Sequence, residues 1–150
     1  MIPNFESMNP TAAAENDLLL AKTLSDFLKK IRVYMLDLTL SEYLMLLLRQ
    51  KKLKRADVVR DSGLEKAYVY QIFNGEKKPT RDKLIAIAFG LHLNRKETQR
   101  MLKIGGCSEL YARQTRDAII LFAIHRGMNI WETDDFLADN GLPTIHDPDK

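Results

Sequence analysis

The chain has 150 residues, of which 45% are hydrophobic and 29% are charged, a balance typical of a soluble globular domain with a real core. Its single cysteine, Cys107, excludes an internal disulfide framework and fits a reducing cytoplasm. No apolar run approaches the roughly 18 residues that span a bilayer, and the first residues lack the basic and apolar regions of a secretory signal. We therefore expect a cytoplasmic protein with no membrane partner.

Charge is distributed unevenly along the chain, although the net formal charge is only +3. Residues 49–103 contain 15 Lys and Arg against six Asp and Glu, a balance of +9. Residues 127–150 contain six acidic residues and one lysine, a balance of −5. A basic middle region indicates a polyanionic partner. A solvated basic surface would explain the charges equally well, so a more specific signal is needed.

Helical patterns dominate from the N-terminal region onward. We expect residues 1–14 to be a flexible leader and residues 15–38 to hold an N-terminal helix, whose apolar residues recur every three or four positions. Thr39 and Glu42 have the spacing of a capping box, which predicts a second helix from there to about Gln50.

Four short helices are predicted in the middle of the chain. Two of them, over residues 54–61 and 64–73, are terminated by Ser62-Gly63 and Asn74-Gly75. Thr80 is a candidate N-cap for the third, which runs to about residue 89.

The fourth starts where Asn94 and Glu97 repeat the capping pattern, and it ends before Gly105-Gly106. A helical hairpin is then predicted within residues 105–143, from helices over residues 110–125 and 130–139. Gly127 and the Asn129 cap supply its turn, and residues 144–150 form a polar tail. The whole protein is therefore predicted to be all-α.

The most specific pattern lies between residues 53 and 91. A short helix, the turn glycine Gly63, a helix with spaced aliphatic residues, an Asn-Gly stop and a basic loop with Pro79 follow one another. In this order and spacing, the region from residue 40 to residue 102 resembles the Cro/cI-like (XRE) helix-turn-helix family of bacterial and phage DNA-binding regulators. The resemblance implies a five-helix lambda-repressor-like DNA-binding domain over residues 39–104, with an extra N-terminal helix and a C-terminal helical hairpin.

The helix over residues 65–73 has an inner and an outer side. At about 100° per residue, Val69 and Ile72 lie together and must pack inward. The opposite side carries a cation, a small residue, a phenol and an amide but no carboxylate, and such a helix suits the DNA major groove. A solvated helix face is the alternative. The resemblance maps base reading onto Lys66, Ala67 and Gln71, with Tyr70 adjacent.

The resemblance also implies contacts with DNA phosphates, which set affinity and salt dependence rather than sequence choice. The residue that opens the first motif helix and the basic loop after the second helix carry these contacts in the family. For Tyr68, which points sideways, a phosphate contact and simple packing are alternatives. The expected phosphate-binding residues are Lys54, Arg55, Tyr68, Asn74, Lys77, Lys78 and Arg81.

These expectations make the chain a sequence-specific regulator that binds double-stranded DNA, a repressor associated with the bacterial nucleoid when bound. One helix reads only a few base pairs, so two half-sites are normally needed, and we expect a homodimer formed through the C-terminal hairpin. The alternative is an antitoxin-like or adaptor protein whose flanking helices grip a protein partner.

No pattern indicates an enzyme, a metal site or a cofactor. The three histidines, His92, His125 and His146, are dispersed, and HExxH, CxxC, glycine-rich phosphate loops and nucleophile elbows are all lacking. Asp134 and Asp135 are interpreted as solvated charges. We therefore expect no catalytic residue.

Overall fold

A computed structural model describes residues 23, 24, 26 and 38–146 of the chain. The chain divides into two units, Met1–Leu38 and Thr39–Lys150. In the first unit, the backbone N–H of Asp26 donates to Thr23 Oγ1 at 3.0 Å. The expected leader and nearly all of the expected N-terminal helix lie outside the described residues.

Residues 38–146 form seven helices and no strand, so this part of the chain is all-α, as predicted. None of these helices is long and apolar enough to cross a membrane. Apart from α8, their bounds agree with the predictions to within a residue or two. The helices are α3 (Leu40–Gln50), α4 (Arg55–Ser62), α5 (Lys66–Phe73), α6 (Arg81–Gly90), α7 (Arg95–Ile104), α8 (Thr115–Arg126) and α9 (Ile130–Asp139).

Reciprocal capping boxes determine where three of these helices begin. In each box a side-chain oxygen and a glutamate satisfy two backbone N–H groups that a helix start leaves without an intrahelical partner. The pairs are Thr39 with Glu42, Asn94 with Glu97, and Asn129 with Glu132. Thr80 precedes α6 at the predicted position, but its side chain makes no capping hydrogen bond.

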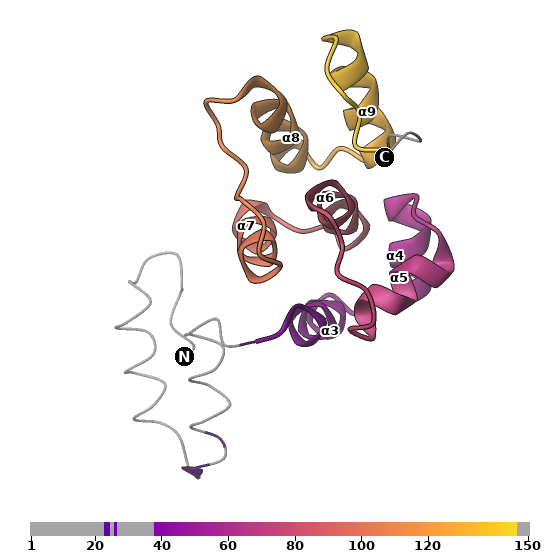
Figure 1. The fold of residues 1–150 in the computed structure, drawn as a ribbon, viewed down its shortest axis with the longest axis vertical. Helices are drawn as coiled ribbons and strands as arrows, with labels where there is room; N and C mark the ends of the chain where they lie inside the picture. Colours follow the sequence, from indigo (N-terminus) through magenta and orange to yellow (C-terminus); the bar gives the residue numbers. More distant parts are fainter. Residues whose placement is uncertain (1–22, 25, 27–37, 147–150) are drawn as a thin grey trace. The chain divides into compact units, whose positions relative to one another are not determined.

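Helix α6 forms the centre of the core, where it packs against α4 and α7 (Figure 1). Its residues 84–90 are all buried, as expected of a helix that is apolar on every side. Gly90 allows the close crossing with α4, because a Cβ atom there would lie 2.8 Å from the carbonyl oxygen of Val58. Helix α3 packs against α5 and α7, and α8 packs against α7 and α9.

The prediction that the hairpin's first helix starts at Leu110 is wrong, because α8 begins at Thr115. Leu110 is buried as its apolar character demands, but it lies in the connecting segment. The Gln99 side chain accepts from the N–H of Leu110 at 2.7 Å and donates to its carbonyl oxygen at 2.8 Å. The side-chain amide of Gln99 thus satisfies the backbone N–H and carbonyl groups of Leu110, which a helix would otherwise satisfy.

The polar tail predicted from residue 144 begins instead with a packed turn. Ile145 is buried, and its N–H donates to Asp134 Oδ1 at 2.6 Å. The N–H of His146 donates to Asp134 Oδ2 at 3.2 Å. Asp134 is therefore a partly buried acceptor, and its interpretation as a solvated charge is wrong.

Candidate nucleic-acid interface

Helix α5 has two chemically different sides. Val69, Ile72 and Phe73 are almost fully buried, and the helix packs against α3 and α4. On the outer side, Lys66 and Ala67 are exposed and the side chains of Tyr70 and Gln71 are half-buried. The structure thus places the four residues expected to read bases on the side of α5 that does not face the core.

The turn between α4 and α5 depends on Gly63. Its φ of +71° lies in the left-handed region, which glycine adopts without the steric cost of a Cβ atom. The N–H of Gly63 donates to the carbonyl oxygen of Val59 at 3.2 Å, and the N–H of Leu64 donates to Ser62 Oγ at 3.2 Å. Leu64 is buried and anchors the start of the segment that leads into α5.

Hydrogen bonds from residues outside α5 fix its C-terminal end, where they are accepted by two backbone carbonyl groups of the helix. Gln71 accepts from the backbone N–H groups of Glu76 and Lys77, at 2.8 and 3.3 Å. The hydroxyl of Ser41, on α3, donates to the carbonyl oxygen of Phe73. The basic loop therefore leaves α5 along a defined path.

Two of the expected DNA-contacting cations lie against the ring of Tyr70, and Asn74 is hydrogen-bonded to one of them. The guanidinium carbon of Arg55 lies 5.0 Å from the ring centroid, and Lys66 Nζ lies 5.6 Å from it. Arg55 Nη1 also donates to Asn74 Oδ1 at 3.3 Å. Such cation–π contacts hold both cations near the outer side of α5. Within residues 38–146 neither cation has an ion-pair partner.

Three further lysines, which precede α4 or follow α5, have no ion pair among the described residues: Lys54, Lys77 and Lys78. All three are exposed. Lys77 and Lys78 line a groove of about 450 Å³ beside the first turn of α3 and Gly105-Gly106. The positive charge in this part of the molecule is therefore not neutralised internally.

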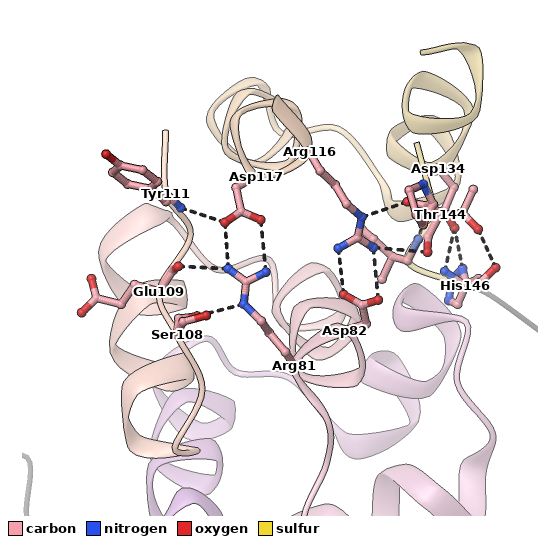
Figure 2. Close-up of polar contacts among 12 residues, drawn as sticks. Arg81, Asp82, Ser108, Glu109, Tyr111, Arg116, Asp117, Asp134, Thr144 and His146 are labelled. Carbon is pink, nitrogen blue, oxygen red and sulfur yellow. Dashed lines mark hydrogen bonds and ion pairs between the residues drawn. The ribbon is translucent and has the colours of Figure 1, made fainter. Parts of the chain in front are cut away.

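Arg81 differs from this group, although it too was expected to bind phosphate. Its Nε donates to the carbonyl oxygen of Ser108 at 2.9 Å, and its Nη2 donates to that of Glu109 at 2.9 Å. Both terminal nitrogens also donate to the Asp117 carboxylate, at 3.1 and 2.8 Å (Figure 2). The guanidinium is committed to contacts within the fold, so we leave it out of the candidate interface.

A second ion pair of the same form lies beside the first. Arg116 donates to both carboxylate oxygens of Asp82, at 3.0 and 3.1 Å (Figure 2). An Arg-Asp dipeptide thus lies in the first turn of α6 and another in the first turn of α8, and each arginine binds the aspartate of the other helix. Sequence reasoning missed this arrangement, and the dipeptide alone does not indicate it, because in Arg60-Asp61 the two side chains bond to each other.

The two ion pairs attach the C-terminal hairpin to α6. Burial opposes ionisation of Asp117, but hydrogen bonds from Arg81 and from the N–H of Tyr111 outweigh it and hold the pKa of this carboxyl below its ordinary value. Burial lowers the pKa of Arg116 from its ordinary value despite the nearby carboxylate of Asp117. Both pairs are largely shielded from solvent, with side-chain exposures of 3% for Asp117 and 11% for Asp82.

Tyr68 lies on a different side of α5 from Tyr70. Its half-buried ring is 5.8 Å from Lys83 Nζ, and burial raises the pKa of its hydroxyl. The ring lines an open groove of about 650 Å³ between the α4–α5 turn and α9. The groove is lined by Gly63, Leu64, Glu65, Tyr68, Lys83, Trp131, Asp134 and His146.

No protein-family model matches this chain, and no curated protein or solved structure is significantly similar to it. Within the described residues, no group of three or more His, Cys, Asp or Glu side chains could hold a metal ion.

Proposed function

We propose that the chain is a sequence-specific regulator of transcription, a repressor, that binds double-stranded DNA and reads the major groove with α5. One observation carries the proposal: the outward side of α5 is chemically suited to bases, and its side chains make no polar contact with described residues other than the cation–π contacts around Tyr70. The side chains of Lys66, Ala67 and Gln71 form no hydrogen bond or ion pair with any described residue.

The residue types on this side match what base edges offer. A lysine at position 66 donates to guanine O6 and N7, and a glutamine at position 71 pairs bidentately with the N6 and N7 atoms of adenine. Ala67 permits close approach and contacts a thymine methyl group. The resemblance to Cro/cI-like regulators supports the same assignment, with α3–α7 as the five helices of the DNA-binding domain.

Phosphate contacts come from both ends of the motif in this proposal. Lys54 and Arg55 precede and open α4, whereas Asn74, Lys77 and Lys78 follow α5. Each phosphate that these cations neutralise releases counterions, so they supply affinity that weakens with salt. Asn74, which accepts from Arg55, orients that guanidinium beside the outward side of α5.

Selection of bound sequences from random duplexes tests the proposal with the full chain. We expect one short sequence to be enriched by the protein and not by the Lys66→Ala/Gln71→Ala double variant. Because both side chains lie outside the core, circular dichroism should show an unchanged helix content in this control. If the protein enriches no sequence above the control, specific recognition is wrong.

We further propose that the regulator is a homodimer formed through its C-terminal hairpin. The two helices of the hairpin, α8 and α9, expose three aromatic side chains, Phe122, Trp131 and Phe136, at 46%, 49% and 47% of their surface. Large apolar side chains exposed in this way are typical of protein interfaces. Sedimentation equilibrium should give a dimer for the full chain and a monomer for Phe122→Ser/Phe136→Ser, whereas a monomeric wild-type protein would exclude this interface.

A second candidate function is an antitoxin-like or adaptor protein that uses the same aromatic side chains to hold another protein. The exposed acidic side chains of α9, Glu132, Asp135 and Asp139, favour a basic partner. Purification from the native host with a stoichiometric basic protein, together with indifference to every duplex, would favour this function over DNA reading.

A further inference from the structure

His146 connects the end of the described chain to the helix-turn-helix. Its Nε2 lies 2.6 Å from the carbonyl oxygen of Ser62, the last residue of α4. Its Nδ1 lies 3.1 Å from Asp134 Oδ2 on α9 (Figure 2). A carbonyl oxygen only accepts, so Nε2 must carry a hydrogen, and an ionised carboxylate only accepts, so Nδ1 must carry one too. Both nitrogens donate at once only in the imidazolium form.

Neither neutral tautomer fits this geometry. If Nε2 keeps the hydrogen, the Nδ1 lone pair faces the Asp134 carboxylate. If Nδ1 keeps it, the Nε2 lone pair faces the Ser62 carbonyl oxygen at 2.6 Å. Loss of one proton therefore converts one of the two attractive contacts into a repulsive one.

We propose that His146 is a proton-dependent latch, which in its imidazolium form clamps the α4–α5 turn against α9 and on deprotonation releases the turn. The latch itself does not depend on what the protein binds. Its predicted effect on DNA binding rests on the proposed function, because α5 is then the helix that reads bases.

The imidazole lies directly on the turn that determines where α5 begins. A Cβ atom on Gly63 would be 2.7 Å from both Cε1 and Nε2 of His146, so the ring fits only against a glycine. Leu64 and Glu65, which lead into α5, line the same groove as the imidazole. A change in the Ser62–His146 contact therefore acts on the segment that orients α5.

The groups around His146 favour its charged form. The hydrogen bond that His146 donates to Asp134 raises the pKa of His146, burial lowers it, the hydrogen bond to the Ser62 carbonyl raises it, and the charge of Lys83 lowers it. The net pKa lies above its ordinary value. Burial opposes ionisation of Asp134, but the hydrogen bonds from His146 and from two backbone N–H groups hold its pKa below the ordinary value. The groove around His146 is lined by four further titratable groups, which are Asp134 from α9, Lys83 from α6, and Glu65 and Tyr68 from the start of α5. Arg116 from α8 interacts electrostatically with Asp134.

These directions define when the latch is closed. The folded pKa of His146 is raised, so the stabilisation is complete below the ordinary histidine pKa and is lost as pH rises through the raised value. The folded pKa of Asp134 is lowered, so the stabilisation that its carboxylate contributes is lost only as pH falls through that lowered value. The latch is therefore closed between the lowered pKa of Asp134 and the raised pKa of His146, and it opens as pH rises through the latter.

The only tryptophan in the chain reports on the latch. The ring centroid of Trp131 lies 6.3 Å from that of His146, and an imidazolium quenches indole fluorescence more strongly than a neutral imidazole does. With the full chain, Trp131 fluorescence should increase with pH in one step whose midpoint lies above the ordinary histidine value of 6.5. An NMR titration of the His146 ring in the wild-type protein should give the same midpoint.

Three variants make the assignment specific. His146→Gln should abolish the step, Asp134→Asn should move its midpoint to lower pH, and His125→Gln, the matched control on α8, should leave it unchanged. Circular dichroism tests whether each variant is folded. If His146→Gln does not fold, the NMR titration of the wild-type protein tests the assignment to His146 instead. A step that persists in folded His146→Gln, or an NMR midpoint at or below the ordinary histidine value, overturns the latch.

The link to α5 is tested with the duplex selected above. Wild-type affinity should fall several-fold as pH rises through the His146 midpoint, whereas that of His146→Gln should not change over the same range. An identical pH dependence in both proteins overturns the coupling between the latch and α5. If no duplex binds at any pH while the fluorescence step is present, the proposed function fails and the latch itself is supported.

Discussion

Arg81 and Asp117, 36 positions apart, form a bidentate ion pair in which the guanidinium donates to both carboxylate oxygens at 3.1 and 2.8 Å. Beside it, Asp82 and Arg116 form the reciprocal pair. The start of α6 is thereby joined to the start of α8, and the C-terminal hairpin belongs to the same unit as α3–α7. A basic residue that resembles a phosphate contact in the sequence is thus part of the frame that holds the hairpin.

Removing one partner of this pair should destabilise the fold. Arg81→Ala leaves the buried Asp117 carboxylate without its guanidinium, and we expect the free energy of unfolding to fall by about 2–4 kcal/mol. Urea denaturation measures this loss. Lys103→Ala is the matched control, because its pair with Glu109 is exposed and should contribute less than about 1 kcal/mol. Equal losses in the two variants would contradict a structural role for Arg81.

Stability should also fall in acid. The folded pKa of Asp117 is lowered, so its contribution is complete above the ordinary aspartate pKa of 3.8 and is lost as pH falls through the lowered value. Thermal unfolding measured from about pH 6 to about pH 2, on both sides of the ordinary aspartate pKa, should show this loss. Asp117→Asn should start from a lower stability and depend less on pH, and a parallel pH dependence in both proteins would refute this source of acid lability.

Gln71→Ala should relax sequence preference at a single base pair. The substitution removes a bidentate donor and acceptor, and we expect discrimination at that position to fall by about 1–3 kcal/mol. Competition between the selected duplex and its single-base variants measures the change. The remaining positions of the site serve as the internal control, and loss of preference at all of them together would point to a folding defect.

Lys78→Ala should act in the opposite way, because a phosphate contact carries no sequence information. Affinity for every duplex should decrease by a similar factor, and the slope of log K against log salt should become shallower by about 0.9. Fluorescence anisotropy at several salt concentrations gives both quantities. Arg81→Ala should keep the wild-type slope under conditions in which it is folded, because in the wild-type protein the Arg81 guanidinium is bonded to Asp117 and does not contact phosphate.

Tyr70 provides a test of the cluster on the outer side of α5. Tyr70→Phe keeps the aromatic ring that faces Arg55 and Lys66, whereas Tyr70→Leu removes it. Cation–π contacts at exposed sites contribute about 0.5–1 kcal/mol each, so the leucine variant should bind DNA several-fold more weakly than the phenylalanine variant. Equal affinities in the binding assay would show that the ring does not position the two cations for DNA.

Much of the fold could be read from the sequence because the relevant signals are local. The capping pairs at Thr39, Asn94 and Asn129 and the left-handed glycine at position 63 act over a few residues, and the structure contains each of them. The start of α8 could not be read in this way. It depends on Gln99, which takes over the backbone groups of Leu110 from another helix.

The sequence by itself determined the all-α class, most helix bounds and which side of α5 faces away from the core, because helix periodicity and capping are properties of neighbouring residues. Only the tertiary structure decided which charges are committed within the fold. Arg81 is held by a residue 36 positions away, and the His146 imidazole reaches a carbonyl group 84 positions away. Such contacts arise when packing brings distant segments together, and no local pattern distinguishes a cation that pairs in this way from one that stays on the surface.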